Sequence, residues 1–203
     1  MQDHVTEQEL KDRLILIENM IAEGRRTTES WGWVFVLWGV AYYAAIAWSA
    51  WGQSAWAWPV TMVAAAIVTL VIASLKAGKH PETTLGRAIG SIWIALGVSM
   101  LLLFLALGLS GRLDQRVFIP VVSAILGMAN GASGLLLRWK IQFACAIVWW
   151  AAAVASCFGT EVWSMIVFLV AIFLCQIVFG LYGLIADVQK HKRRQTQDRP
   201  AHA

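Results

Sequence analysis

Long apolar runs separated by short polar segments dominate the sequence. Six of them predict helices over residues 31–51, 56–75, 88–109, 118–137, 141–158 and 162–185. Each run has roughly the 20 residues needed to cross a bilayer, and almost no ionisable side chain lies inside any of them. The links at 52–55 and 159–161 are short enough to force antiparallel neighbours. The pattern therefore predicts an all-α polytopic membrane protein, with six transmembrane helices arranged as three antiparallel hairpins.

A different periodicity precedes the first apolar run. Within residues 6–23, apolar side chains recur with 4-3-4 spacing at Leu10, Leu14, Ile17 and Ile21, here called the apolar stripe. Thr6 and Glu9 have capping-box spacing, and Gly24 is a natural helix end. This predicts a cytoplasmic amphipathic helix in a domain over 1–30, ahead of a transmembrane domain over 31–186.

The stripe needs an apolar partner, and the sequence leaves several open. They are the membrane surface, a second copy of the chain, another protein, or the underside of the protein's own bundle. The membrane surface is the weaker option, because interfacial helices usually present a basic face and residues 1–30 have seven acidic side chains against four basic ones. Docking under the bundle would bring this acidic segment near Lys76, Lys79, Arg87, Arg138 and Lys140.

Charge then orients the spans. The chain is 59% hydrophobic with a formal net charge of +4, which no soluble domain of 203 residues accommodates easily. All the Lys and Arg residues except Arg112 and Arg116 lie in the N-terminal segment, the 76–87 loop, the 138–140 turn or the C-terminal tail. Under the positive-inside rule this predicts that both termini are cytoplasmic. The basic tail over 187–203 is expected to be disordered, and no nucleic-acid partner is predicted.

Small and amide residues predict how the helices meet. Glycines at helical spacing mark close approach of a second helix, at Gly127, Gly131 and Gly134 in the fourth span, Gly180 and Gly183 in the sixth, and Gly86, Gly90 and Gly97 around the third. Asn130 and Gln176 place amides inside the bilayer, where an unpaired amide is costly. They either hydrogen-bond across a contact between spans four and six or line a small polar cavity.

Candidate chemistry is sparse. Gly131-Ala132-Ser133-Gly134 resembles the GxSG motif of rhomboid intramembrane proteases, a family that pairs this serine with a histidine in its sixth span. The sixth span here has no histidine, and a serine without a base is a poor nucleophile. No intramembrane carboxylate is available for proton coupling, and no metal-ligand spacing occurs. We expect no catalytic residue, no cofactor and no metal.

One stretch carries a family resemblance. Residues 17–26, reading IENMIAEGRR, and residues 31–39, reading WGWVFVLWG, resemble the segment leading into the first span of uncharacterised bacterial integral-membrane proteins. The resemblance implies a bacterial inner membrane and supplies no functional residues. We expect a non-enzymatic anchor, regulatory subunit or assembly partner that acts through residues 6–23, as a homodimer or with a protein partner. The alternative is a permease or binding protein for a neutral or hydrophobic small molecule.

Overall fold

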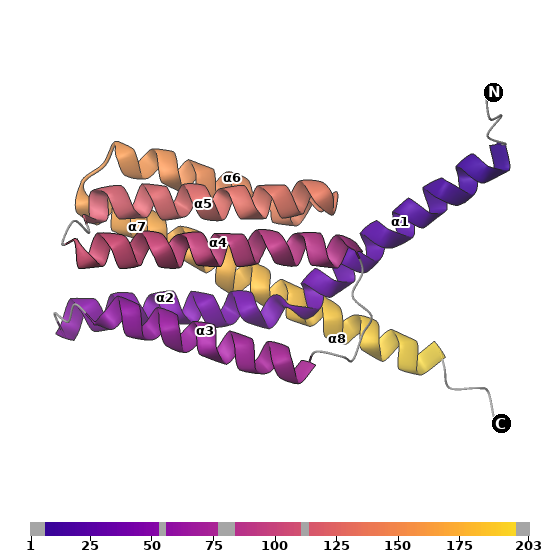
Figure 1. The fold of residues 1–203 in the computed structure, drawn as a ribbon, viewed down its shortest axis with the longest axis horizontal. Helices are drawn as coiled ribbons and strands as arrows, with labels where there is room; N and C mark the ends of the chain where they lie inside the picture. The colour runs from indigo at the N-terminus through magenta and orange to yellow at the C-terminus, as the bar shows by residue number, and fades with distance from the viewer. Residues whose placement is uncertain (1–6, 53–55, 77–83, 111–113, 198–203) are drawn as a thin grey trace.

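The structure, a computed structural model, describes residues 7–52, 56–76, 84–110 and 114–197. Within these ranges the chain is helical and has no strand (Figure 1). The helices are α1 (Glu7–Ser30), α2 (Gly32–Gly52), α3 (Ala57–Lys76), α4 (Thr84–Leu109), α5 (Gln115–Leu136), α6 (Lys140–Cys157), α7 (Glu161–Ile172), the π-helix η1 (Phe173–Val178) and α8 (Phe179–Gln197).

Six helical segments are long and apolar enough to cross a membrane. They are Gly32–Gly52, Ala57–Leu75, Thr84–Leu107, Arg116–Leu136, Lys140–Cys157 and Glu161–Lys190. The prediction of an all-helical chain with six apolar spans is therefore confirmed. The sixth segment is one continuous rod in which α7, η1 and α8 follow each other without a break.

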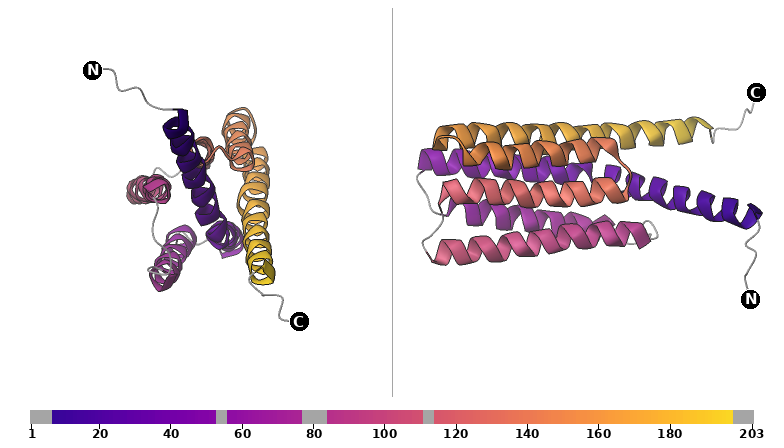
Figure 2. Two further views of the ribbon diagram at one scale, coloured as in Figure 1. Left: turned by 90° about the vertical axis from the view of Figure 1, so that its right-hand side faces the viewer. Right: turned by 90° about the horizontal axis from the view of Figure 1, so that it is seen from above.

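Most helices that are adjacent in sequence pack side by side, but α3 and α4 do not. α2 contacts α3, and α6 contacts α7, as the short links require. The most extensive contact joins α5 to α6, a pair that the expected hairpins had separated. The long sixth segment crosses the bundle and also packs against α2 and α1, so that helices from the two halves of the chain lie side by side (Figure 2).

The core lies between α5, α6, the sixth segment and α2. Trp149, Phe168 and Ile172 are almost completely buried there, and Val122 and Leu126 of α5 complete the centre. Aromatic rings join this core to neighbouring helices: Phe35 of α2 makes edge-to-face contacts with Trp93 of α4 and Phe179 of α8. Such contacts add to the area that each ring buries.

The turn between α5 and α6 has an unusual residue at its centre. The Trp139 amide donates to the Gly134 carbonyl at 2.8 Å, and the Arg138 amide donates to the Leu135 carbonyl at 3.1 Å. This is the Schellman arrangement of a helix C-terminus, in which the residue after the cap is left-handed and usually glycine. Here that residue is Arg138, with φ of 48°. An arginine therefore occupies a position that glycine would fill with less strain.

Two boundaries differ from the sequence prediction. Helix α1 does not end at Gly24 but continues to Ser30. A Cβ at Gly24 would lie 2.8 Å from the Leu137 side chain, so this glycine lets α1 approach the bundle rather than stopping the helix. Helix α8 continues to Gln197, which corrects the prediction of disorder from 187 onward. The segment from Val188 to Gln197 has no glycine or proline to end a helix. Thr6, Lys79, Arg112 and residues 198–203 lie outside the described residues.

Candidate functional site

The N-terminal part of α1 extends beyond the bundle as an exposed arm. Every residue from 7 to 20, here called the α1 arm, is exposed (Figures 1 and 2). The stripe residues Leu10, Leu14 and Ile17 are 52%, 60% and 52% exposed, and only Ile21 is half-buried. Docking of the whole stripe under the bundle is therefore not found. The apolar side chains of the arm lie where the described part of the chain supplies no cover.

The base of α1 is fastened to the bundle by polar contacts. Arg25 donates from Nε to the Leu137 carbonyl oxygen at 2.7 Å and from Nη2 to the Arg138 carbonyl oxygen. These are carbonyls at the C-terminus of α5, where a cation also complements the helix dipole. Farther along α1, the buried carboxylate of Glu29 pairs with Lys190 of α8. The base of α1 is thus held to both α5 and α8, while the α1 arm stays clear of them.

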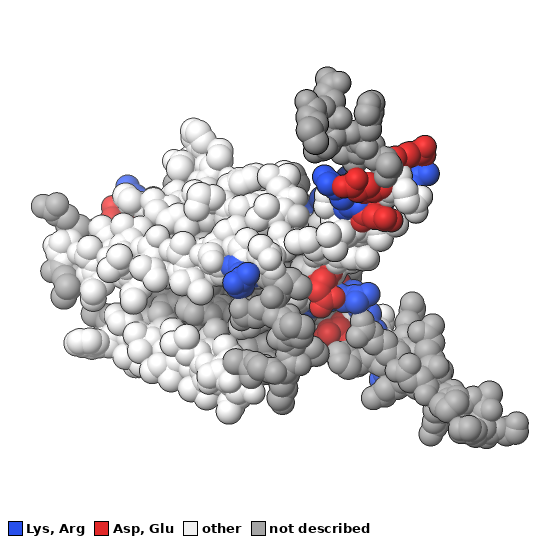
Figure 3. Space-filling model, turned by 45° about the vertical axis from the view of Figure 1, so that its right-hand side comes forward, with Lys and Arg blue, Asp and Glu red and all other residues white. Residues whose placement is uncertain are grey.

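An open groove of about 630 Å³ lies where α1 leaves the bundle. Glu18, Ile21 and Arg25 line it from α1, and Arg138, Lys140 and Phe143 line it from the α5–α6 turn and the start of α6. Three of these six side chains are cationic, and one is a carboxylate. Figure 3 shows charged side chains concentrated at the end from which α1 projects, while the rest of that face is almost uncharged.

Inside the bundle, several buried polar groups have no hydrogen-bond partner. The orphaned atoms include Asn130 Oδ1, Ser133 Oγ, Gln176 Oε1 and both side-chain polar atoms of Gln142. Gln142 is fully buried and had not been singled out from the sequence. The available signal was an amide within an apolar run, two residues after the basic edge at Lys140. An orphaned amide costs about 1–3 kcal/mol, so these groups call for an explanation.

Helix register places these groups at one depth. A Cβ on Gly131 would meet the Ala146 side chain, and one on Gly134 would meet the Phe143 backbone, which fixes how α5 runs against α6. The Cys175 thiol lies 3.5 Å from the Cys145 carbonyl oxygen, which fixes η1 against α6. With this alignment of the helices and a rise of 1.5 Å per residue, Asn130, Ser133, Gln142 and Gln176 fall within about 8 Å of each other along the helix axes.

The two amides predicted from the sequence do not bond to each other. Asn130 Nδ2 donates instead to the Leu126 carbonyl of its own helix at 2.9 Å, while Asn130 Oδ1 and Gln176 Oε1 have no partner. Gln176 sits in η1, a π-helical turn of the kind found at functional sites. The Tyr43 hydroxyl donates to the Leu169 carbonyl at 2.8 Å, four residues before this turn begins.

The five glycines of spans four and six all lie where another helix approaches. Gly127 and Gly131 lie against Trp150 of α6, and Gly134 lies against the Phe143 backbone. Gly180 and Gly183 lie against the backbone of α2 and the end of α1. The predicted contacts around Gly90 and Gly97 are absent, because nothing described lies within 4 Å of a Cβ at either position.

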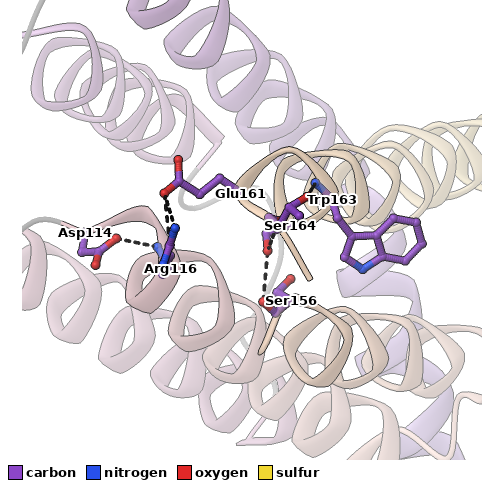
Figure 4. A network of polar contacts seen from close by, with 7 residues as sticks. Asp114, Arg116, Ser156, Glu161, Trp163 and Ser164 are labelled. Carbon is purple, nitrogen blue, oxygen red and sulfur yellow. Dashed lines mark hydrogen bonds and ion pairs between the residues drawn. The ribbon is translucent and has the colours of Figure 1, made fainter. Parts of the chain in front are cut away.

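The opposite end of the bundle has a small polar network (Figure 4). Arg116 of α5 pairs with Glu161 of α7 at 3.0 Å, and Asp114 caps α5 by accepting from the Arg116 amide at 2.9 Å. Ser164 donates to the Ser156 carbonyl at 3.0 Å. The ion pair is exposed, so it contributes little stability. The serine contacts join the end of α6 to the start of α7, and we therefore interpret this network as structural.

The catalytic features weighed from the sequence are a motif serine and a metal site. Ser133, the serine of the GxSG-like motif, is fully buried in the α5–α6 contact, and its hydroxyl has no partner. No three His, Cys, Asp or Glu side chains in the described ranges gather closely enough to hold a metal ion. Comparison with protein families, with curated proteins and with solved structures finds no match to this chain. The candidate sites are therefore the α1 arm, the groove at its base and the buried polar groups.

Proposed function

We propose that this is a non-enzymatic multi-pass membrane protein whose α1 arm is an assembly element, pairing with the arm of a second copy. The observation that carries the proposal is the exposure of Leu10, Leu14 and Ile17 on a helix that projects away from the bundle. Apolar groups clustered at a surface mark interaction sites. The adjacent Ile15 and Leu16 are also exposed, at 56% and 61%, so the apolar surface of the arm extends beyond one stripe.

The charges flanking the stripe favour a second copy as the occupant. In a heptad with Leu10 and Ile17 at d and Leu14 at a, Arg13 takes a g position and Glu18 the following e position. In a parallel pair, residue g of one helix faces residue e of the next heptad of its partner, so Arg13 and Glu18 form opposite-charge pairs across the interface. Two copies in one bilayer share one orientation, which brings their arms together in parallel.

The short stripe needs help from the membrane. Fewer than two heptads do not hold an isolated coiled coil together in water. Confinement to one bilayer raises the effective concentration of one arm near another, so a weak helix contact suffices. In this proposal the protein lies in a bacterial inner membrane, and both of its termini, and therefore the arm, are on the cytoplasmic side. The distribution of Lys and Arg and the resemblance of residues 17–39 support this setting.

Cysteine cross-linking in the native membrane tests the assembly. In a Cys157→Ser background, which removes the exposed native thiol, Leu14→Cys should give a cross-linked dimer. Asp12→Cys is the matched control, because it is equally exposed on the arm but lies about 200° around the helix. Equal cross-linking at both positions, or none at Leu14→Cys, would rule out the second copy. An adduct to a different protein would instead identify a heterologous partner.

A second candidate function rests on the buried polar groups. We infer that a permease or binding protein for a neutral small molecule would use Asn130, Gln142 and Gln176, whose side chains have polar atoms without a partner and lie at similar depth. Flux of small neutral solutes into proteoliposomes tests this proposal. Two variants are compared: the double substitution Asn130→Leu/Gln176→Leu and a deletion of residues 1–24. A permease loses flux in the double variant and keeps it in the deletion, whereas an assembly protein shows no flux in either.

A further inference from the structure

The groove at the base of α1 brings together three cations, Arg25, Arg138 and Lys140, that the assembly of arms does not use. We propose that it binds the headgroup of an anionic phospholipid, with the phosphodiester between Arg138 and Lys140. The acyl chains then run along the outer surface of α5 beside Leu135, which is 66% exposed. The site would tie the lipid to the point where α1 leaves the bundle.

The position of the groove matches the headgroup layer. Arg138 and Trp139 line the groove from the α5–α6 turn, where one apolar span ends and the next begins. The exposed basic residues Arg138 and Lys140 at such a boundary are typical of the membrane–water interface. Basic pockets at the cytoplasmic ends of transmembrane helices are known to hold anionic headgroups. A groove of about 630 Å³ has room for one.

The charges of the groove are available to a ligand. Neither Arg138 nor Lys140 forms an ion pair within the described residues, and both are exposed. Arg25 uses Nε and Nη2 for the carbonyls of the turn, which leaves its Nη1 group for a phosphate oxygen. Glu18 is the one carboxylate on the lining, so the groove has a net positive charge of two.

Two features of the backbone support an anion there. Arg138 holds a left-handed conformation that glycine would adopt with less strain, which indicates that its side chain is used. Helix α6 begins directly after the turn, and Trp139 gives it no side-chain cap. The amides of its first turn therefore keep donors and a positive dipole end beside the two cations.

Native mass spectrometry of the full-length, delipidated protein tests the proposal. The probes are phosphatidylglycerol and phosphatidylcholine with identical acyl chains. The groove variant is Arg138→Gly/Lys140→Gln, and the matched control Lys11→Gln/Arg26→Gln removes two charges from α1 outside the groove lining. We expect phosphatidylglycerol to be preferred, and its affinity to fall about fivefold per groove charge, or about 25-fold in the groove variant. The control variant should stay within about twofold of the native protein.

Several results would overturn the proposal. They are equal binding of the two lipids, equal losses in the groove and control variants, and full displacement of phosphatidylglycerol by millimolar inorganic phosphate. Arg138→Gly alone guards against misfolding, because glycine suits the left-handed position and should not lower the thermal unfolding midpoint. The affinity of this single variant for phosphatidylglycerol should fall about fivefold. An unchanged affinity would contradict the proposed site.

Discussion

Helices α5 and α3 are both apolar enough to span a membrane, yet they have opposite places in the molecule. In an 18-residue apolar window of α5, 56% of residues are buried inside the protein, against 6% in the corresponding window of α3. The first helix forms the centre of the bundle, whereas the second packs mainly against α2 and has only two buried residues among those described, Ala57 and Ala65. The difference shows that apolar character places a helix in the bilayer without telling whether lipid or protein covers it.

Glycines repeat this comparison on a finer scale. A Cβ at Gly134 of α5 would lie 2.7 Å from the backbone nitrogen of Phe143, whereas a Cβ at Gly90 of α4 would meet nothing within 4 Å. Both glycines are interior to a helix and belong to small-residue patterns. Only the first allows two backbones to approach, so the same spacing has a packing role in one region and none in the other.

Gly134→Ala should have the largest effect. The added methyl meets backbone, which cannot rotate away, so α5 and α6 must separate along their most extensive contact. We expect a loss of about 1–3 kcal/mol in the free energy of unfolding. Denaturation by SDS in mixed micelles, followed by circular dichroism, measures it. A loss below about 0.5 kcal/mol would show that α5 and α6 are not in close contact there.

Gln142→Leu tests whether the α5–α6 region is as dry as its packing implies. The native amide is fully buried with neither polar atom bonded, so an apolar side chain of similar size should raise the free energy of unfolding by about 1–2 kcal/mol. Gln189→Leu on the exposed part of α8 is the control and should change little. A destabilised Gln142→Leu would mean that water or a solute bonds to this amide, which would favour the permease.

Arg25→Gln asks how far α1 depends on the α5–α6 region. The substitution removes the charge that meets the two carbonyls of the turn, and we expect a loss of about 1 kcal/mol. Hydrogen exchange should rise in the base of α1 while α5 and α6 stay protected. Arg26→Gln, whose exposed partner is Glu23, is the matched control. Equal exchange in the two variants would show that the carbonyl contacts do not hold α1.

Gly90→Ala should give the smallest effect and the opposite sign to Gly134→Ala. With open space around the new methyl, only the conformational entropy of glycine is removed, which stabilises a helix by about 0.5–1 kcal/mol. The same SDS titration compares the two variants directly. A destabilised Gly90→Ala would mean that another helix, from this chain or a second copy, covers that face of α4.

The sequence predicted some features well because they depend on local composition. The apolar runs are read residue by residue, so the six spans were found. Gly24 was misjudged because a glycine that ends a helix and one that admits a neighbour look alike in sequence, and only Leu137 and Leu85 nearby distinguish them. For a similar reason, the sequence left open whether Asn130 and Gln176 pair or line a cavity. Equal depth says nothing about which way each helix is rotated.

The sequence by itself determined the helices, their number and their apolar character, because transfer to an apolar medium is a property of each side chain in turn. The tertiary structure decided that α5 and α6 form the tightest pair, that Arg25 caps the α5 terminus, and that the α1 arm stays uncovered. Those features depend on shape and rotation. Lipid and protein interior are equally apolar, so hydropathy cannot choose between them, and contact follows from which surfaces fit.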